Sequence, residues 1–455
     1  MKQVNIGMIG GGTVGSGAFH ALQRNGGLMS SRIGVKVAVR KVAEKAFDEP
    51  RPYEIPRSLM TTDWLSVVND PQVDVVTELV GGTGIARTMI LTALKLGKPV
   101  ITANKALLSE HGEELFAAAG KYGANLYYEA SVCGGIPIIK SLREGFVGNR
   151  ITHLYGIVNG TCNYILTRMK LEGADFDAVL RDAQKQGYAE TPPDLDIDGW
   201  DAQHKIGILA SLAHGFWVNP KRIHVEGIRN ITALDIKFAE QLGYTIKLLG
   251  IIKRIADCRL PIADSGRKTG LKSRIKNQKS KIQVSVYPTL IPSGHVLAGV
   301  NHVFNALFVR GDVVGDTLFY GRGAGKDATA SAVLSDLADA ALDLKFGSKQ
   351  RVPPFVAHEW NGTVVPIEDV VSQYFVRMNV VDKPGVLAKI AAIFGESNIG
   401  ISSVIQPEGH EGESVPLIFM LHYAPNGAVT KALAKIGKLP VVKGRPVMIR
   451  VEDFK

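Results

Sequence analysis

The sequence predicts an α/β protein built from a doubly wound domain, a central α+β domain and a small C-terminal module. Three observations support this fold class. Short apolar runs alternate with helical stretches over residues 1–130, as in a mostly parallel sheet covered by helices. A glycine-rich turn closes the first apolar run. The last segment instead follows the order β-α-β-β-α-β of a ferredoxin-like module. The expected domains are residues 1–130, 131–345 and 370–455.

Bulk composition indicates a soluble globular protein. A chain of 455 residues suits about three domains of ~150 residues, and 45% hydrophobic with 21% charged residues is an ordinary globular balance. We find no apolar run of the ~20 residues that a membrane span requires, and no signal peptide. Three cysteines, Cys133, Cys162 and Cys258, have no metal-site or disulfide spacing. We therefore expect a cytoplasmic protein without a membrane partner.

The net charge of +10 is concentrated in residues 259–281. This stretch holds several basic residues against one acid, Asp264, together with glycines and serines, and it predicts a solvated loop inserted in the central domain. Because no aromatic side chains are interleaved there to stack on bases, we do not expect a nucleic-acid partner. The basic residues are Arg259, Arg267, Lys268, Lys272, Arg274, Lys276, Lys279 and Lys281.

The glycine-rich turn predicts a dinucleotide site in a Rossmann-type domain. The apolar strand Val4–Ile9 leads into Gly10-x-Gly12-x-x-Gly15, and a helix follows from Ser16. The first glycine makes the tight turn, the second lets the backbone approach a pyrophosphate, and the third lets helix and strand pack closely. The anion is expected on the N–H groups of the helix start, so the cofactor-binding residues expected here are Gly10, Gly12, Thr13, Val14 and Gly15.

The rest of the first domain supplies two cations near the expected ligand crevice. The second strand is expected to end at Arg40, where an NAD-binding domain usually has an acid. A cation there favours the 2′-phosphate of NADP. The alternative is a surface arginine that stacks on adenine without preference. Lys105 follows the strand Pro99–Ala103, at the sheet edge where ligands bind, and the alternative is a solvated lysine. The other strands expected are Val35–Arg40, Val73–Leu79 and Asn125–Glu129, and the helices are Thr88–Leu96 and Leu107–Ala119.

The central domain contains an acid and a lysine spaced for one helix face. A helix is predicted over Asp201–His214 with Asp198 as its N-cap, which places Asp201 and Lys205 four residues apart. Because the rest of this helix is apolar nearly all round, we expect it to be buried and its charged pair to be desolvated, which suits proton transfer. The alternative is an ordinary surface ion pair.

The remaining elements of the central and C-terminal domains complete the predicted fold. The central helices are Ile136–Phe146, Tyr164–Glu172 and Phe176–Gln186, and its strands are Ile151–Val158, Ile282–Tyr287, Ala306–Arg310 and Asp316–Tyr320. The C-terminal strands are Tyr374–Val380, Ser402–Gln406, Val415–Tyr423 and Val447–Val451, with helices Pro384–Glu396 and Val429–Gly437.

Two glycine-rich turns of the central domain stay open to more than one interpretation. Residues 129–137 join a strand to a helix through Gly134 and Gly135. They form either a plain turn or a ring of carbonyls around a hard monovalent cation. Residues 320–325, with Gly323 at their centre, precede a helix and bring backbone close to a ligand.

Together these motifs resemble the homoserine dehydrogenase family, in its longer bacterial form with a C-terminal ACT domain. The resemblance covers nearly the whole chain in order. The matching segments are Gly10–Gly15, Thr102–Lys105, Glu129–Pro137, Asn159–Tyr164, Gly187–Glu190, Asp196–Lys205, Pro288–Pro292, Gly321–Gly325 and, for the ACT domain, Asp382–Leu387.

The resemblance implies an oxidoreductase that interconverts L-homoserine and L-aspartate 4-semialdehyde with NAD(P), on the route to threonine and methionine. Lys205 would be the acid/base residue, with Lys105 assisting beside the nicotinamide. Asp201 and Asp196 would position the substrate and the lysine, and Glu190 would receive the homoserine ammonium. Gly187 and Gly323 would contact the cofactor. A sodium-like cation would be held by the backbone of Glu129, Val132, Gly134 and Ile136. The protein would be a homodimer or homotetramer.

The ACT-like segment implies feedback control, with threonine bound at Asp382–Leu387; the alternative is a structural or dimerising appendage. Two rival functions remain from the residues alone. One is another NAD(P) enzyme, such as an aspartate-type or semialdehyde dehydrogenase, although an acylating enzyme needs a reactive cysteine and Cys133 has no histidine nearby in sequence. The other is a non-catalytic nucleotide sensor, which has no use for a desolvated lysine at position 205.

Overall fold

A computed structural model of the chain describes residues 1–255, 280–407 and 414–454. These residues form two compact units. The first unit comprises Met1–Gly160, Asp201–Lys221 and Phe304–Gly362, and the second comprises Thr161–Trp200, Arg222–Val303 and Thr363–Lys455. Each unit is described by itself. The division into three domains at the expected boundaries stays a prediction.

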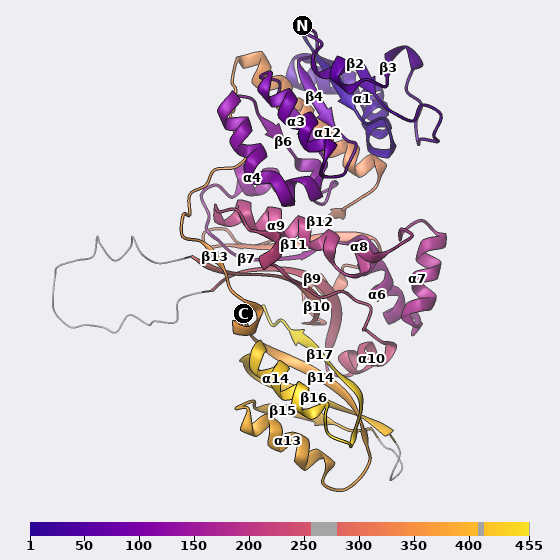
Figure 1. Cartoon of the computed structure of the whole chain (residues 1–455), viewed down its shortest axis with the longest axis vertical. Coiled ribbons are helices and arrows are strands. Elements are labelled where there is room, and N and C mark those ends of the chain that lie inside the picture. Colours follow the sequence, from indigo (N-terminus) through magenta and orange to yellow (C-terminus); the bar gives the residue numbers. More distant parts are fainter. Residues whose placement is uncertain (256–279, 408–413, 455) are drawn as a thin grey trace, which may run out of the picture. The chain divides into compact units, whose positions relative to one another are not determined.

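The first unit contains the expected parallel sheet. Six strands lie in the order β3-β2-β1-β4-β5-β6, with every paired neighbour parallel (Figure 1). This is the strand order of a Rossmann dinucleotide-binding domain, so the predicted fold of this part is confirmed. The strands are β1 Lys2–Ile9, β2 Val35–Ala43, β3 Met60–Thr61, β4 Val75–Glu78, β5 Val100–Thr102 and β6 Leu126–Tyr127.

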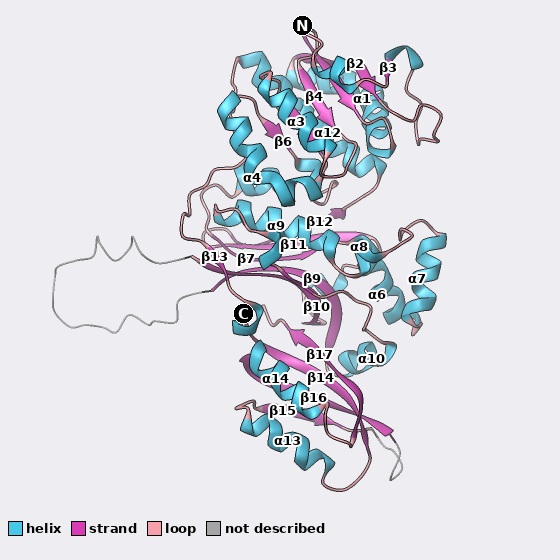
Figure 2. Ribbon diagram, viewed as in Figure 1, coloured by secondary structure: helices cyan, strands magenta, loops and turns pink. Residues whose placement is uncertain are grey.

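Helices cover this sheet, and one of them comes from far along the chain. Helix α12, Lys326–Phe346, packs on α1, Thr13–Ile33, so closely that a Cβ on Gly17 would lie 3.0 Å from the Lys326 carbonyl oxygen. Apolar residues of α12 share one buried core with β1 and α1. The other helices of the sheet are α2 Trp64–Val68, α3 Ile85–Lys95 and α4 Lys105–Tyr122 (Figure 2).

The first unit also contains an antiparallel sheet and a buried helix. Strand β11, Phe304–Gly311, pairs with both β7, Ile151–Ile157, and β12, Gly315–Arg322. Helix α9, Trp200–His214, lies against β7. Their contact is close: a Cβ added to Gly156 on β7 would lie 3.6 Å from the Ile206 side chain on α9. The predicted helix over Ile136–Phe146 consists of α5, Ile138–Lys140, followed by a π-helical turn over Ser141–Gly145.

The second unit begins with helices and a long strand pair. Strands β9, Tyr244–Ile255, and β10, Lys281–Pro292, are antiparallel, with Ile255 opposite Lys281. The expected basic loop therefore joins two paired strands, but residues 256–279 lie outside the described residues. Strand β9 and helix α10 were not predicted. The other elements here are α6 Gly160–Glu172, α7 Phe176–Lys185, α8 Asp194–Ile197, β8 His224–Val225 and α10 Ala233–Gln241.

The C-terminal part of this unit has the predicted β-α-β-β-α-β order. Its strands lie in the order β17-β14-β16-β15, and β17 pairs in parallel with β10. Side chains from both helices and all four strands form one buried core. The elements are β13 Thr363–Val364, β14 Val371–Val381, α13 Val386–Glu396, β15 Ile401–Ile405, β16 Ser414–Pro425, α14 Asn426–Ile436 and β17 Val442–Val451. Within the described ranges, no helix is long and apolar enough to span a bilayer.

Candidate active site

The glycine turn has the geometry that a dinucleotide requires. Gly10 has a φ of +99°, and a Cβ there would lie 2.6 Å from the Leu79 carbonyl. A Cβ on Gly15 would lie 2.0 Å from the Gly10 oxygen, whereas one on Gly12 would meet nothing within 4 Å. The first and third glycines are thus fixed by packing, and the second borders open space. No side chain caps the start of α1, so its N–H groups are left for an anion.

A pocket of about 410 Å³ opens at this turn. Gly10 and Gly12 line it from one side and Glu44, Lys45 and Trp64 from the other. Thr13 and Val14 form the first turn of α1 beside it, and Gly15 follows them. The five predicted residues of the turn therefore lie together at a cavity lined by both apolar and charged side chains, and the residues fit a dinucleotide.

The prediction that β2 ends at Arg40 is wrong. The strand continues to Ala43, which pairs with Ile9, and a register shift after Ile6 makes Arg40 the extra residue of β2. Its guanidinium Nε lies 2.9 Å from Asp70, and Arg40 does not line the pocket. The residue at the true strand end is Glu44. The basic pair at 40 and 41 concealed the continuation of the strand, because such side chains are depleted in buried strands.

Lys105 lies at the carboxyl end of the parallel sheet, as expected. It is the first residue of α4 and follows β5 by two residues. Asn104 caps the helix by accepting the Leu107 N–H at 3.1 Å. The Lys105 ammonium lies 2.9 Å from Oδ1 of Asp201, on α9. The structure thus brings together two residues that are 96 positions apart in the sequence.

Asp201 and Lys205 form the desolvated pair that the apolar helix predicted. The Lys205 Nζ donates to Oδ2 of Asp201 at 2.7 Å and to the carbonyl of Val158 at 2.7 Å. Both side chains are less than a tenth exposed. Burial alone would raise the pKa of Asp201, but the ammonium groups of Lys205 and Lys105 outweigh it and hold this pKa well below its usual range. Asp201 therefore stays ionised between two lysines.

Asn159 belongs to this cluster, although no role of its own was expected for it. Its Nδ2 donates to Oδ2 of Asp201 at 2.9 Å, the same oxygen that binds Lys205. Val158 follows β7 directly and its carbonyl accepts from Lys205, and Asn159 is the next residue. The end of one strand thus orients both members of the pair. The signal in the sequence was a polar residue at a strand end, next to a helix start.

The expectation that Asp198 caps α9 is wrong. Asp198 instead ends α8, and Gly199, with a φ of +88°, separates it from α9. Its carboxylate accepts from Arg229 Nη2 at 3.0 Å, and Arg229 also pairs with Asp194. Because Arg229 is distant in sequence from Asp198, local sequence patterns could not predict this ion pair.

The predicted substrate residues lie in the second unit. Glu190 is exposed, and its backbone carbonyl accepts from Gln184 at 3.1 Å. Asp196 lies on α8, and its carbonyl accepts from the Cys162 thiol at 3.1 Å. Gly187 follows α7 with a φ of +73°.

The two glycine-rich turns of the first unit contact each other. Gly134 N–H donates to the Gly323 carbonyl at 2.9 Å, and Gly135 N–H donates to Arg322 at 3.0 Å. A Cβ on Gly323 would lie 2.0 Å from the Asn305 amide. Burial raises the pKa of Cys133, which makes its thiol a poor nucleophile.

The one carboxylate of the turn at 129–136 accepts hydrogen bonds from the backbone of the chain itself. Both oxygens of Glu129 accept backbone N–H groups, from Ile139 at 3.0 Å and Lys140 at 2.8 Å. Burial raises the pKa of Glu129 to about 7. In the part of the chain that the structure describes, no group of three or more His, Cys, Asp or Glu side chains is arranged to hold a metal ion. Any cation at this turn would therefore depend on backbone oxygens, Val132 and Ile136 included.

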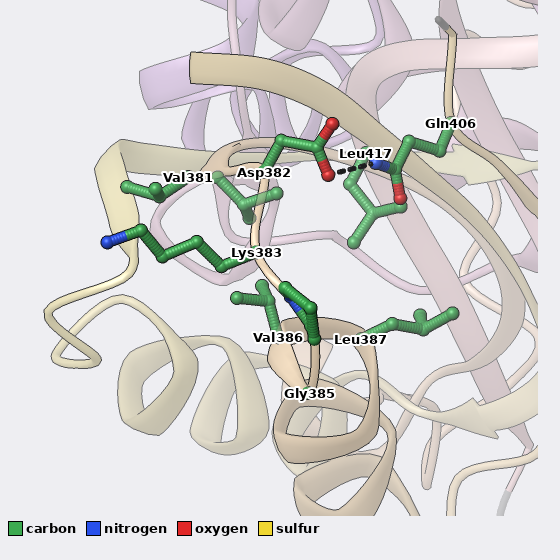
Figure 3. A pocket seen from close by; sticks show the side chains of 10 residues that line it. Val381, Asp382, Lys383, Gly385, Val386, Leu387, Gln406 and Leu417 are labelled. Carbon is green, nitrogen blue, oxygen red and sulfur yellow. Dashed lines mark hydrogen bonds between the residues drawn. The ribbon is translucent and has the colours of Figure 1, made fainter. Parts of the chain in front are cut away.

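A separate pocket of about 350 Å³ lies at the start of α13 (Figure 3). Gly385, with a φ of +84°, precedes the helix, and no side chain caps its first turn. Gln406 Nε2 donates to Oδ1 of Asp382 at 2.9 Å across one wall. Val386, Leu387 and Leu417 add apolar surface. The predicted Asp382–Leu387 loop thus borders a cavity that has an uncapped helix start and a carboxylate.

Comparisons with known proteins find relatives along the whole chain. Residues 10–129 match the family model "Homoserine dehydrogenase, NAD binding domain", and residues 137–338 match "Homoserine dehydrogenase". Homoserine dehydrogenase of Pseudomonas aeruginosa is 40% identical over 459 residues, covering 100% of both chains. A crystal structure of a homoserine dehydrogenase from Thiobacillus denitrificans superposes with a TM-score of 0.88 at 40% identity, over 100% of this chain and 99% of that one. A hyperthermophilic archaeal homoserine dehydrogenase in complex with NADPH gives a TM-score of 0.57 at 25% identity, over 75% and 98%.

Proposed function

The chain belongs to the homoserine dehydrogenase family, and we therefore propose that it interconverts L-homoserine and L-aspartate 4-semialdehyde in threonine and methionine biosynthesis. The observation that carries this proposal is the Lys205–Asp201–Lys105 cluster at the carboxyl end of the dinucleotide-binding sheet. A bound nicotinamide dinucleotide would accept the hydride from C4 of homoserine. The residues of the chain supply the rest of the chemistry.

Lys205 is the acid/base residue of this mechanism. In reduction the Lys205 ammonium gives its proton to the carbonyl oxygen as hydride reaches C4, and in oxidation the neutral amine left by that step accepts the proton of the C4 hydroxyl as hydride leaves the carbon. Asp201 fixes the Nζ position and balances its charge, and Asn159 fixes Asp201. Lys105 binds the other oxygen of Asp201 and supplies a second positive charge beside the developing alkoxide.

The test is an absorbance assay of L-homoserine oxidation by the purified protein with each nicotinamide cofactor. We expect reduced cofactor to appear only with homoserine, not with L-aspartate. A protein that binds the cofactor but oxidises no homoserine contradicts the proposal and favours the nucleotide sensor.

We propose Glu190 as the carboxylate that binds the homoserine ammonium. Asp196, a little further along the chain, would help to position the substrate. The exposure of Glu190 leaves its carboxylate accessible to a cationic ligand. Glu190→Gln is expected to raise the KM for homoserine by about 10- to 100-fold, because a charge-assisted hydrogen bond contributes about 1.5–3 kcal/mol. The KM for the cofactor should stay unchanged. Steady-state kinetics measure both, with the nearby Glu172→Gln as control; equal KM values for homoserine in the variant and the parent would remove Glu190 from the site.

A monovalent cation such as sodium completes the proposed site, held by backbone carbonyls of Glu129, Val132, Gly134 and Ile136. The internal use of the Glu129 carboxylate supports coordination by carbonyls rather than by that side chain. Exchange into sodium-free buffer should lower the thermal midpoint of unfolding, and readdition of sodium should restore it. We further propose that the enzyme works in the cytoplasm as a homodimer or homotetramer.

The pocket at Asp382–Leu387 supports a regulatory ACT domain, and we propose L-threonine as its ligand. The α-carboxylate would bind at the start of α13 and the ammonium at Asp382. Saturating L-threonine is expected to lower homoserine oxidation, and Asp382→Ala should abolish this inhibition while leaving uninhibited turnover intact. The exposed Asp369→Ala is the control. An enzyme whose turnover ignores threonine would favour a structural or dimerising role for this domain.

A further inference from the structure

A carboxylate occupies the strand end where the sequence suggested a cation. Glu44 follows β2 directly and lines the same pocket as Gly10 and Gly12. We propose that Glu44 binds the adenosine ribose hydroxyls of the dinucleotide and makes this enzyme prefer NAD to NADP. The inference rests on the proposed nicotinamide-dependent function.

Backbone N–H groups fix the Glu44 carboxylate at the glycine turn. Oε2 accepts the Gly11 N–H at 2.6 Å, and Oε1 accepts the N–H groups of Lys45 at 2.8 Å and Ala46 at 3.3 Å. These bonds connect the end of β2 to the β1–α1 turn. The position of the Glu44 carboxylate is therefore fixed without a ligand. It binds Gly11, the neighbour of Gly12, which borders open space.

Such a carboxylate favours one cofactor by charge. The 2′- and 3′-hydroxyls of an adenosine ribose can donate to the oxygens of Glu44, as an acid at this strand end does in NAD-binding domains. A 2′-phosphate has no proton to donate near neutral pH and carries a charge of the same sign. Placing it next to Glu44 costs Coulomb energy in a pocket that is partly shielded from water.

None of the cations described near the pocket forms an ion pair with Glu44. Arg40 pairs with Asp70 outside the pocket. Arg51 lines the pocket, but its Nη2 donates to the carbonyls of Ala46 and Phe47 at 2.9 and 2.8 Å. Lys45 lines the pocket and is exposed, so it is the competing candidate for a phosphate contact and has to be tested with Glu44.

The experiment measures binding without turnover. ADP-ribose and 2′-phospho-ADP-ribose are titrated calorimetrically into the full-length protein and into Glu44→Gln, Lys45→Ala and Arg40→Ala. Glu44→Gln keeps an acceptor for Gly11 while it removes the charge. We expect the parent to bind ADP-ribose at least about tenfold more tightly than the phosphorylated compound, and Glu44→Gln to reduce that ratio about tenfold. Arg40→Ala should leave the ratio unchanged, and kcat/KM for NAD and NADP should follow the same order.

Two results would overturn the inference: tighter binding of the phosphorylated compound by the parent, with the preference lost in Lys45→Ala, or a ratio unaffected by Glu44→Gln. Either result would leave homoserine oxidation itself intact. Absence of binding by both compounds would instead contradict the nicotinamide site as a whole, and with it this inference.

Discussion

Replacement of Lys205 by alanine is expected to lower kcat for homoserine oxidation by about 10²- to 10⁴-fold, the usual contribution of a positioned acid/base group. The variant loses the atom that exchanges the hydroxyl proton and leaves Asp201 with Lys105 and Asn159 as partners. The dissociation constant of the dinucleotide should stay near the parental value, because Lys205 does not line the pocket at the glycine turn. Steady-state kinetics and fluorescence titration of the reduced cofactor measure the two quantities.

The matched control for this prediction is Lys121→Ala, an exposed lysine on α4 in the same unit. It should retain parental turnover and folding. Turnover of Lys205→Ala within a few-fold of the parent, or an equal loss in Lys121→Ala, would remove Lys205 from its proposed role.

Replacement of Arg450 by alanine is expected to destabilise the protein by about 3 kcal/mol, because it removes a buried guanidinium and leaves the buried Asn426 and the partly exposed Glu226 without their partner. Arg450 is 2% exposed in its side chain and donates to both oxygens of Glu226, at 3.0 and 2.9 Å, and to Asn426. Its guanidinium also lies 4.3 Å from the Tyr287 ring centre. Denaturant unfolding measures the change, and the exposed Arg445→Ala on the same strand is the control. A midpoint equal to that of the control would contradict the prediction.

The same ion pair predicts a pH dependence. Burial alone would raise the pKa of Glu226, but hydrogen bonds from His224 and Arg450 lower it from 4.5 to about 2. Because the folded pKa lies below the unfolded one, the contribution of Glu226 to stability is complete above pH 4.5 and is lost as the pH falls toward 2. Since the side chain is about a third exposed, we expect about 1–2 kcal/mol. The stability difference between the parent and Glu226→Gln should shrink as the pH falls below 4.5.

The fold was predictable wherever local patterns reflect burial. The apolar strands and the glycine turn of the first unit correctly predicted its parallel sheet. The near-continuous apolar surface of α9 correctly indicated that Lys205 is desolvated. The β-α-β-β-α-β order of the C-terminal part was also evident, because most of its strands and both helices supply apolar side chains to one core.

The errors arose where tertiary contacts override local signals. Arg40 concealed the last residues of β2, because its partner Asp70 is supplied by another loop. Asp198 had the chemistry of a helix cap but pairs with Arg229. The packing of α12 on α1 joins segments about 300 residues apart, and no periodicity in the sequence encodes such a contact. The hydrogen bond of Asn159 to Asp201 became evident only in the structure.

The most direct test of the account is a crystal structure of the protein with L-homoserine and its nicotinamide cofactor bound. We predict that the C4 hydroxyl oxygen lies within hydrogen-bond reach, about 2.6–3.2 Å, of the Lys205 Nζ, with C4 facing the nicotinamide ring. A substrate whose hydroxyl is bound by other groups, away from the Lys205–Asp201–Lys105 cluster, would contradict it.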